Sequence, residues 1–428
     1  MNVAILAAGA SDMFCGSCLR DSAMARALIR LGHRATLIPL FAPLRTDGED
    51  VSDPRIFYGG INSWLQNRFA FFRHTPRSLD WLLDRRWLLR WAGNLGARTP
   101  PDDVADLTAA IIEGTDGGVR KELHRLVEFL REHVHPQVVS LPNLMFIGAA
   151  GAIRESLGVP VVCELTGEDI FLDAMSHANR SRIRELIRAR TGHVSRFVST
   201  TDYYAERMAE YLAVPRERID VVPTGLAAEF FAPLPTRSPT HRPAVGFLAR
   251  ICPEKGFEAL VDAMLMLKQR PGFDGVRLRA AGYLSPRDRG WFGRLVRRIN
   301  GSALGGEFDH LGEVDQAAKI AMLDSIDILS VPTTWPEPKG IYAIEAMARG
   351  VPVVQPAHGS FPKLIEQTGG GILVPPADAP ALADALAALL SDASQRTALG
   401  ESGRRAVESQ MTEAQMAQAM LSIYQSMQ

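Results

Sequence analysis

Short runs of apolar residues alternate along this chain with longer stretches in which apolar positions recur at helical spacing. The short runs that suit strands lie at residues 3–8, 35–40, 137–140, 159–164, 197–200, 219–222, 244–248, 278–281, 326–331 and 351–354. Runs of this length indicate buried strands, and strands that alternate with helices predict a parallel, doubly wound sheet. We therefore expect an α/β fold.

A change in pattern divides the chain into two parts. Residues 232–243 contain four prolines and few apolar residues, which is typical of a linker between domains. At 428 residues the chain is long enough for two or three domains that each bury a core. We expect an N-terminal domain over residues 1–225, a linker over residues 226–243 and a C-terminal domain over residues 244–409. In the first domain, residues 101–116 should be a flexible segment.

The most informative local pattern lies at residues 326–356, where two apolar runs flank a helical stretch. A proline-rich loop at residues 333–339 leads into a helix predicted over residues 340–349, and Gly350 would end that helix in a left-handed conformation. Such a strand–helix–strand unit places the loop at the carboxyl edge of a parallel sheet, where open α/β folds hold ligands.

Two acidic residues, Glu337 and Glu345, give this unit its candidate chemistry. Glu337 lies in the loop, and Glu345 lies among apolar residues in the second turn of the helix. A glutamate is costly to bury without a partner, so Glu345 is either a solvated residue on a partly exposed helix or points back toward a ligand at the helix start. The free amide groups there, the helix dipole and Lys339 suit an anion. Phosphate-binding amides flanked by two carboxylates fit a sugar nucleotide.

Charge and composition argue against several other classes. The chain has 47 basic and 48 acidic residues, a balance that disfavours broad nucleic-acid binding. Four cysteines are too few for a disulfide scaffold at this size. The N-terminus has the pattern of a first strand rather than of a signal peptide, and no apolar run approaches the length that spans a bilayer. A cytoplasmic enzyme is the default expectation.

The first strand is followed by a glycine-containing loop and a helix, as in nucleotide-binding folds, although the G-x-G-x-x-G spacing of dinucleotide sites is absent. Cys15 and Cys18 form a C-x-x-C motif in this segment. Because such a motif at a helix start can support redox chemistry, a thioredoxin-like domain stays an alternative here. A zinc site would need two more ligands, and none lie nearby in sequence.

Two basic stretches raise the alternative of contact with a membrane surface. Residues 77–91 are amphipathic and combine Trp81 and Trp91 with several arginines, and residues 287–298 form a second basic stretch. Such helices can lie on anionic lipid, so a membrane-peripheral location stays open. Our preferred interpretation of residues 77–91 is a helix whose aromatic side packs on the N-terminal domain or lines a substrate cleft.

Several motifs resemble those of retaining glycosyltransferases of the GT-B fold, especially glycosyltransferase family 4. The segment that starts at Glu337, E-P-K-G-I-Y-A-I-E-A-M-A-R-G-V-P-V-V, is similar to the E-x7-E signature of that family, although Lys339 stands where a small or aromatic residue is usual. The segment that starts at Ala249, A-R-I-C-P-E-K-G, resembles the family pattern G-R-x-x-x-E-K-G with alanine in place of glycine. The segment T-G-E-D, which starts at Thr166, stands where many relatives carry H-G-x-D.

The resemblance implies two doubly wound, Rossmann-like domains that face each other across a cleft, with residues 410–428 crossing back onto the first domain. It also implies a donor site in the C-terminal domain, where Arg250 and Lys255 would neutralise the leaving diphosphate. By the same resemblance Glu337 would hold sugar hydroxyls and Glu345 the ribose.

The resemblance assigns three groups of site residues. Those expected to act in catalysis are Arg250, Lys255, Glu337 and Asp169. Those expected to contact the donor are Gly16, Arg250, Lys255, Val314, Glu337, Pro338, Lys339, Gly340, Ile341 and Glu345. Those expected to contact the sugar or the acceptor are Thr166, Glu168 and Arg20.

The expected reaction also follows from the resemblance. It is the transfer of a sugar, with retention, from a nucleotide-diphosphate sugar to a hydroxyl acceptor such as a glycan, a glycolipid or a small-molecule glycoside precursor, as in polysaccharide biosynthesis. The chain has no D-x-D motif, so we expect no metal at the diphosphate and no cofactor beyond the nucleotide sugar as co-substrate. The alternatives are a GT-B phosphorylase, a sugar-nucleotide epimerase and a non-catalytic sugar-nucleotide-binding subunit.

Overall fold

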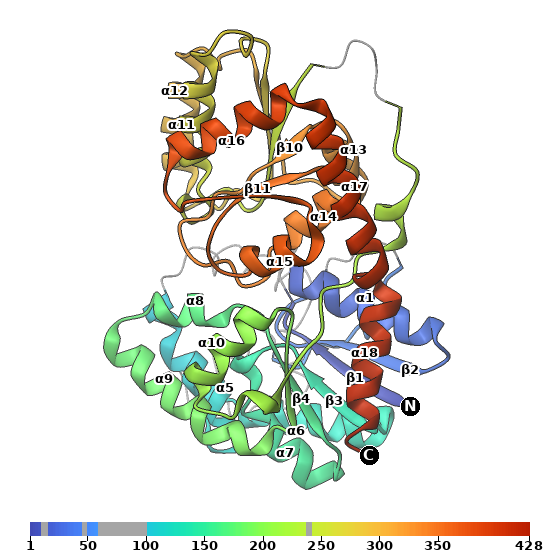
Figure 1. The fold of residues 1–428 in the computed structure, drawn as a ribbon. Coiled ribbons are helices and arrows are strands. Elements are labelled where there is room, and N and C mark those ends of the chain that lie inside the picture. The colour runs from blue at the N-terminus through green and yellow to red at the C-terminus, as the bar shows by residue number, and fades with distance from the viewer. Residues whose placement is uncertain (10–15, 45–48, 59–100, 237–241) are drawn as a thin grey trace. The chain divides into compact units, whose positions relative to one another are not determined.

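The computed structural model describes residues 1–9, 16–44, 49–58, 101–236 and 242–428. Over these residues the chain divides into two units, each built around its own parallel β-sheet (Figure 1). The first unit comprises Met1–Gly225 and Glu413–Gln428, and the second comprises Leu226–Thr412. The predicted α/β architecture with two doubly wound sheets is confirmed.

The sheet of the first unit has six parallel strands in the order β2-β1-β3-β4-β5-β6. The strands are β1 (Asn2–Ala7), β2 (Arg34–Pro39), β3 (Val138–Leu141), β4 (Val161–Leu165), β5 (Arg196–Ser199) and β6 (Ile219–Val221). Successive side chains of β1 enter opposite layers, because Ala4 and Leu6 pack on one face of the sheet and Val3 and Ile5 pack on the other. Coverage of both faces explains why these strands are nearly continuous apolar runs.

Helices cover both faces of this sheet. On one face α1 (Gly16–Arg30) and α18 (Glu413–Gln425) lie side by side, so the last helix of the chain packs against the first described helix (Figure 1). Ion pairs from Glu413 to Arg26 and Arg30 join these two helices. The other face is covered by α5 (Ala105–Glu113), α6 (Arg120–Phe129), α7 (Ala149–Leu157), α8 (Glu168–Asp173), α9 (His177–Arg190) and α10 (Asp202–Leu212).

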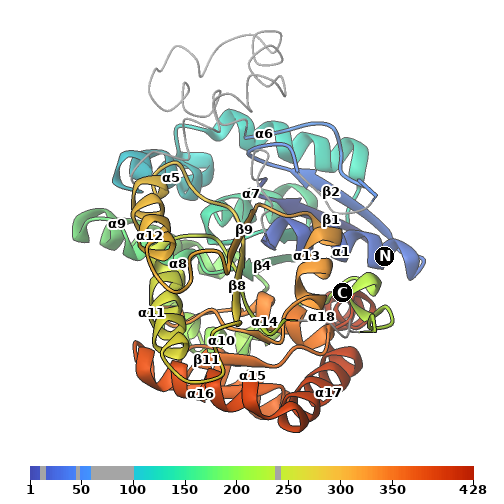
Figure 2. The same ribbon diagram turned by 90° about the horizontal axis from the view of Figure 1, so that it is seen from above.

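The second unit repeats this design with six parallel strands in the order β12-β11-β10-β7-β8-β9. The strands are β7 (Ala244–Leu248), β8 (Arg277–Ala281), β9 (Phe308–Gly312), β10 (Ile328–Leu329), β11 (Val353–Pro356) and β12 (Gly371–Val374). The helices are α11 (Phe257–Lys268), α12 (Arg289–Asn300), α13 (Gln316–Asp324), α14 (Ile341–Ala348), α15 (Phe361–Thr368), α16 (Ala379–Ser391) and α17 (Ala393–Gln410). Helix α16 packs against α11 (Figure 2). Helix α17 packs against α14.

One segment of the first unit differs from the sequence-based expectation. Residues 101–116 were expected to be flexible, but they form a short 3-10 turn followed by α5. Ala105, Ala109 and Ile112 of this helix are buried against the sheet layer. The prediction was wrong because it was based on the prolines and acidic residues at the start of the segment. The apolar positions that follow them form the buried side of the helix.

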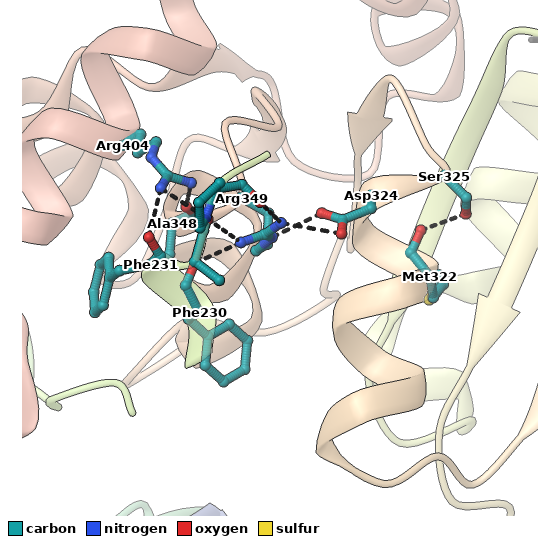
Figure 3. Close-up of polar contacts among 10 residues, drawn as sticks. Phe230, Phe231, Met322, Asp324, Ser325, Ala348, Arg349 and Arg404 are labelled. Carbon is teal, nitrogen blue, oxygen red and sulfur yellow. Dashed lines mark hydrogen bonds and ion pairs between the residues drawn. The ribbon is translucent and has the colours of Figure 1, made fainter. Parts of the chain in front are cut away.

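The segment after residue 225 is held against the rest of the second unit by hydrogen bonds from arginine side chains to its backbone carbonyls. Arg349 Nη1 donates to the carbonyl oxygens of Phe230 at 3.1 Å and of Ala232 at 2.8 Å. The same guanidinium forms a two-pronged ion pair with Asp324 at 2.7 and 3.0 Å, so it lies between the segment and α13 (Figure 3). Arg404 Nη2 adds a contact of 2.8 Å to the carbonyl of Phe231 (Figure 3). The proline content of this segment gave no sign of these arginines from distant parts of the sequence.

None of the helices that the structure describes combines the length and apolarity that crossing a bilayer requires.

Replacing Arg349 by alanine should destabilise the second unit strongly. Its side chain is 2% exposed, so the variant loses the carbonyl contacts and leaves Asp324 without its cation. Removal of one partner from a buried ion pair costs roughly 3 kcal/mol or more in free energy of unfolding. Urea unfolding measures this loss. Arg405→Ala, which removes an exposed arginine 3.6 Å from Glu401, is the control and should change little. Equal stability of the two variants would contradict this account of the segment.

Candidate functional site

Loops that follow the strands of the second sheet come together at its carboxyl edge. The loop after β7 carries Arg250 and Lys255, the loop after β10 carries Glu337, and the loop after β11 leads into α15. Two glycines allow this close packing. A side-chain carbon at Gly256 would lie 1.8 Å from the carbonyl oxygen of Pro332, and one at Gly359 would lie 2.4 Å from the amide nitrogen of Glu337. Both glycines also have positive φ angles, +74° and +64°, which glycine adopts without strain.

Glu337 is the centre of this loop cluster. It is 5% exposed, and its Oε2 accepts from Lys255 Nζ at 2.5 Å and from the Tyr342 hydroxyl at 3.1 Å. Its Oε1 accepts from the backbone amides of Lys339 and Gly340 at 3.3 and 3.4 Å. Burial raises the pKa of the Glu337 carboxyl, but the Lys255 ammonium and the two amides outweigh burial and hold the pKa below its ordinary value. The carboxylate is therefore ionised at neutral pH.

The cations of the site come from one short segment. Lys255 has 17% of its side chain exposed, and its Nζ lies 5.5 Å from the centre of the Tyr342 ring. Arg250 is exposed. Burial raises the pKa of Glu254, but hydrogen bonds from its own amide and from Cys252, together with the charge of Arg250, hold that pKa below its ordinary value. The loop after β7 thus carries one cation that is held in place by Glu337 and a second that is exposed, and cations of this kind suit a doubly charged group.

Glu345 is buried, so the alternative of a solvated residue on an exposed helix is wrong. It is 7% exposed, and its Oε1 accepts from Lys319 Nζ of α13 at 2.7 Å. Lys319 was not singled out from the sequence. It is one lysine in a helix of ordinary composition, and no sequence spacing connects it to a residue of α14.

Helix α14 begins where the sequence predicts. Gly340, at φ 65°, precedes it, and every residue from Tyr342 to Ala348 is buried. Pro338 is buried, whereas Lys339 and Ile341 are half-buried beside the helix start. Val314 lies in the loop between β9 and α13, at the same edge of the sheet. The predicted donor contacts of the C-terminal half thus gather at one sheet edge.

The predicted residues of the first unit also follow strands. Gly16 is exposed at the start of α1, and Thr166 is half-buried after β4. Arg20 is 4% exposed and forms a buried ion pair through Nη1 with Glu164 of β4. The Nε and Nη2 atoms of Arg20 have no hydrogen-bond partner in the part of the chain that the structure describes.

The two acidic residues of the T-G-E-D motif, Glu168 and Asp169, accept hydrogen bonds from other parts of the first unit. Glu168 Oε1 accepts from the amide of Leu144 at 3.1 Å, and its Oε2 accepts from the amide of Thr166 at 2.6 Å. Asp169 is 1% exposed and accepts from the Tyr204 hydroxyl at 2.7 Å and from Arg207 Nε at 2.6 Å. These contacts order the turn after β4. A role for either carboxylate toward sugar or acceptor stays a prediction.

The remaining sequence motifs fall into two groups. Cys18 is 1% exposed in α1, whereas Cys15 and residues 77–91 lie outside the described residues. Of the second basic stretch, α12 buries Phe292, Leu295 and Ile299 in the core, so its apolar side is not available to lipid. Across the ranges that the structure describes, no group of three or more histidine, cysteine, aspartate or glutamate residues is arranged to hold a metal ion.

Comparison with known proteins places the chain in a family. The profile of "Glycosyl transferases group 1" matches residues 233–406, and that of "Glycosyltransferase Family 4" matches residues 116–230. The phosphatidyl-myo-inositol mannosyltransferase of Mycobacterium leprae is 34% identical over 194 residues, which cover 44% of this chain and 48% of that protein. The chain therefore spans about half the length of the curated relatives that it matches first.

Solved structures share the fold over the whole chain. The Anabaena protein HepE, in complex with UDP and glucose, has a TM-score of 0.68 at 16% identity and is covered over 100% of both chains. Sucrose-phosphate synthase from Thermosynechococcus elongatus has a TM-score of 0.71 at 18% identity, covering 99% of this chain and 98% of that one. From the two family profiles and the shared architecture, we conclude that the chain belongs to the GT-B glycosyltransferases of the group 1 and family 4 type.

Proposed function

We propose that this protein transfers a sugar from a nucleotide-diphosphate sugar to a hydroxyl acceptor, with retention of configuration and without a metal ion at the diphosphate. The observation that carries the proposal is the arrangement of Lys255, Glu337 and the amides at the start of α14. The names of related proteins support the class of donor. The structure of HepE holds UDP and glucose, and the mycobacterial relative is named as a mannosyltransferase.

The diphosphate would bind where Glu337 now finds its donors. Lys255 Nζ and the amides of Lys339 and Gly340 all donate to this carboxylate. A phosphate group is also attracted by a cation and by the free amides of a helix start, so it competes with Glu337 for the same three groups. Binding of the donor would then free the Glu337 oxygens to accept hydrogen bonds from sugar hydroxyls.

The other predicted donor contacts fit around this exchange. Arg250 would add a second positive charge to the leaving diphosphate. Glu345, whose position is fixed by Lys319 at 2.7 Å, would accept from the ribose hydroxyls. Gly16, Val314, Pro338 and Ile341 are proposed to contact the donor through backbone and apolar atoms.

The chemical step requires no side-chain nucleophile. The acceptor oxygen forms a bond to the anomeric carbon as the bond from that carbon to the phosphate oxygen breaks. The acceptor proton passes to the departing phosphate, and the nucleoside diphosphate leaves with its charge neutralised by Lys255 and Arg250. Attack on the same face as the leaving group gives retention. Thr166, Glu168 and Arg20 are proposed to position the acceptor.

Turnover tests the proposed roles of the two cations. Nucleotide sugars that raise the melting temperature are assayed for transfer to hydroxyl acceptors. Arg250→Ala and Lys255→Ala should each lower kcat by roughly 10²-fold. Because Arg250 is exposed, its variant should keep wild-type stability, which separates loss of catalysis from loss of folding. Arg405→Ala is the control for removal of a surface cation. Full turnover in both variants would overturn the proposal, and sugar interconversion without an acceptor would favour an epimerase.

The ionisation of Glu337 gives a second prediction. In the wild type its lowered pKa contributes stability above the ordinary glutamate value of 4.5, and that contribution is lost as the pH falls through the lowered pKa. In Lys255→Met burial remains without the cation, so the pKa of Glu337 rises and the protein is less stable at pH 7, by roughly 3 kcal/mol.

The stability difference between wild type and Lys255→Met should therefore shrink as the pH falls, first where Glu337 takes up a proton in the variant, whose pKa is raised, and then where it does so in the wild type, whose pKa is lowered. Urea unfolding at pH 7 and pH 4 measures this change. Lys363→Met, at an exposed lysine, should show no such trend. A difference that stays constant between the two pH values would mean that Lys255 does not hold the charge of Glu337.

A further inference from the structure

Several buried polar atoms at the carboxyl edge of the second sheet have no hydrogen-bond partner in the described part of the chain. They belong to the loops that follow β10 and β11, and they are Thr333 Oγ1, Trp335 Nε1, His358 Nδ1 and Ser360 Oγ. A buried polar group without a partner costs stability, so such a group calls for an explanation, and a ligand is one. Their shared position points to the loop cluster around Glu337.

Ser360 is the member of this set with the most defined position. It is 3% exposed, and its amide donates to the Glu337 carbonyl at 2.8 Å. Its Oγ lies 3.5 Å from the point where a side-chain carbon on Gly340 would be. The hydroxyl is therefore beside the start of α14, on a residue whose backbone is hydrogen-bonded to Glu337.

The Ser360 hydroxyl does not cap the start of α15. Ser360 immediately precedes α15, the position where serine usually accepts a hydrogen bond from a backbone amide of the first turn. Its φ and ψ angles of −78° and −14° are helical instead, and its side chain makes no capping hydrogen bond. The usual structural role of a serine at this position is therefore absent.

Two helix starts converge at this point. Helix α14 begins after Gly340 and α15 begins after Ser360, and each helix has eight residues. The start of a helix carries partial positive charge, so an anion between two such starts is favoured by both dipoles. The unpartnered hydroxyl adds a donor between them.

We propose that Ser360 Oγ donates a hydrogen bond to the diphosphate of the donor, so that the start of α15 forms a second wall of the donor site. This inference rests on the proposed function. It adds a contact that the sequence motifs did not assign, because Ser360 lies in a segment of the sequence with no site residue. A hydroxyl can also accept from a sugar hydroxyl, but the two helix starts favour the phosphate.

The variant Ser360→Ala tests the proposal with little disturbance of the fold. Because Oγ has no protein partner, its removal breaks no hydrogen bond, and the melting temperature should stay the same or rise. Affinity for a nucleoside diphosphate should fall roughly 10-fold, as expected for loss of a hydrogen bond to a charged group. UDP, GDP and ADP are titrated calorimetrically into wild type to find the tightest, which is then used with the variants.

Ser402→Ala is the matched control. Its Oγ donates to the Thr368 carbonyl at 2.9 Å, near the far end of α15 from Ser360. This variant loses a protein hydrogen bond, so its melting temperature should fall while its affinity for the nucleoside diphosphate stays at the wild-type value. The two serine variants thus have opposite expected patterns.

The remaining outcomes separate the possible failures. If Ser360→Ala binds the nucleoside diphosphate like wild type but binds the nucleotide sugar more weakly, the hydroxyl contacts the sugar and the phosphate assignment is overturned. If neither affinity changes, Ser360 does not contact the donor. Lys255→Ala is titrated in parallel. If Lys255→Ala binds the nucleoside diphosphate with wild-type affinity, the proposed donor site is wrong. If Lys255→Ala binds it weakly while Ser360→Ala binds it normally, the donor site stands and only the role of Ser360 is wrong.

Discussion

The contact between Lys255 and Glu337 is the constraint on which the rest of the site depends. A glutamate that is 5% exposed stays ionised only if cations and amides replace the water that it has lost. Meeting this need holds the loop after β7 against the loop after β10 and orients both toward the start of α14. The protein thus maintains, at the carboxyl edge of the second sheet, a place where a negative charge is stabilised. In this structure the protein's own Glu337 carboxylate fills this place.

Such an arrangement suits a ligand that must be bound and then released. A phosphate and the Glu337 carboxylate need the same donors, so binding of one loosens the other. In the proposed exchange, binding of the phosphate makes the acid available to sugar hydroxyls. Glu345 is held in a parallel way by Lys319, through a second carboxylate–lysine contact at 2.7 Å. Both acids of the E-x7-E motif are therefore placed by lysines from other elements.

Much of this fold could be predicted from the sequence because the signals are local. The apolar runs of the strands and the helix after Gly340 depend on neighbouring residues, and each of the ten predicted runs overlaps a strand of the structure, although β9 and β12 were not among them. The contacts that were missed join distant residues. Lys319 meets Glu345 across two helices, Arg349 meets the carbonyls of residues 230 and 232, and Ser360 reaches Gly340 from the next loop. No spacing in the sequence encodes these pairings. The prediction for residues 101–116 was wrong for a different reason. The start of this segment is polar, and the helix that follows it is stabilised by tertiary packing.

The most direct test of this account is the crystal structure of the protein with a nucleoside diphosphate, because it measures which group Lys255 contacts. We predict a phosphate oxygen within hydrogen-bond distance, about 3 Å, of both Lys255 Nζ and the Gly340 amide, with Glu337 displaced from them. A nucleoside diphosphate bound elsewhere, with Lys255 still on Glu337, would contradict the central claim.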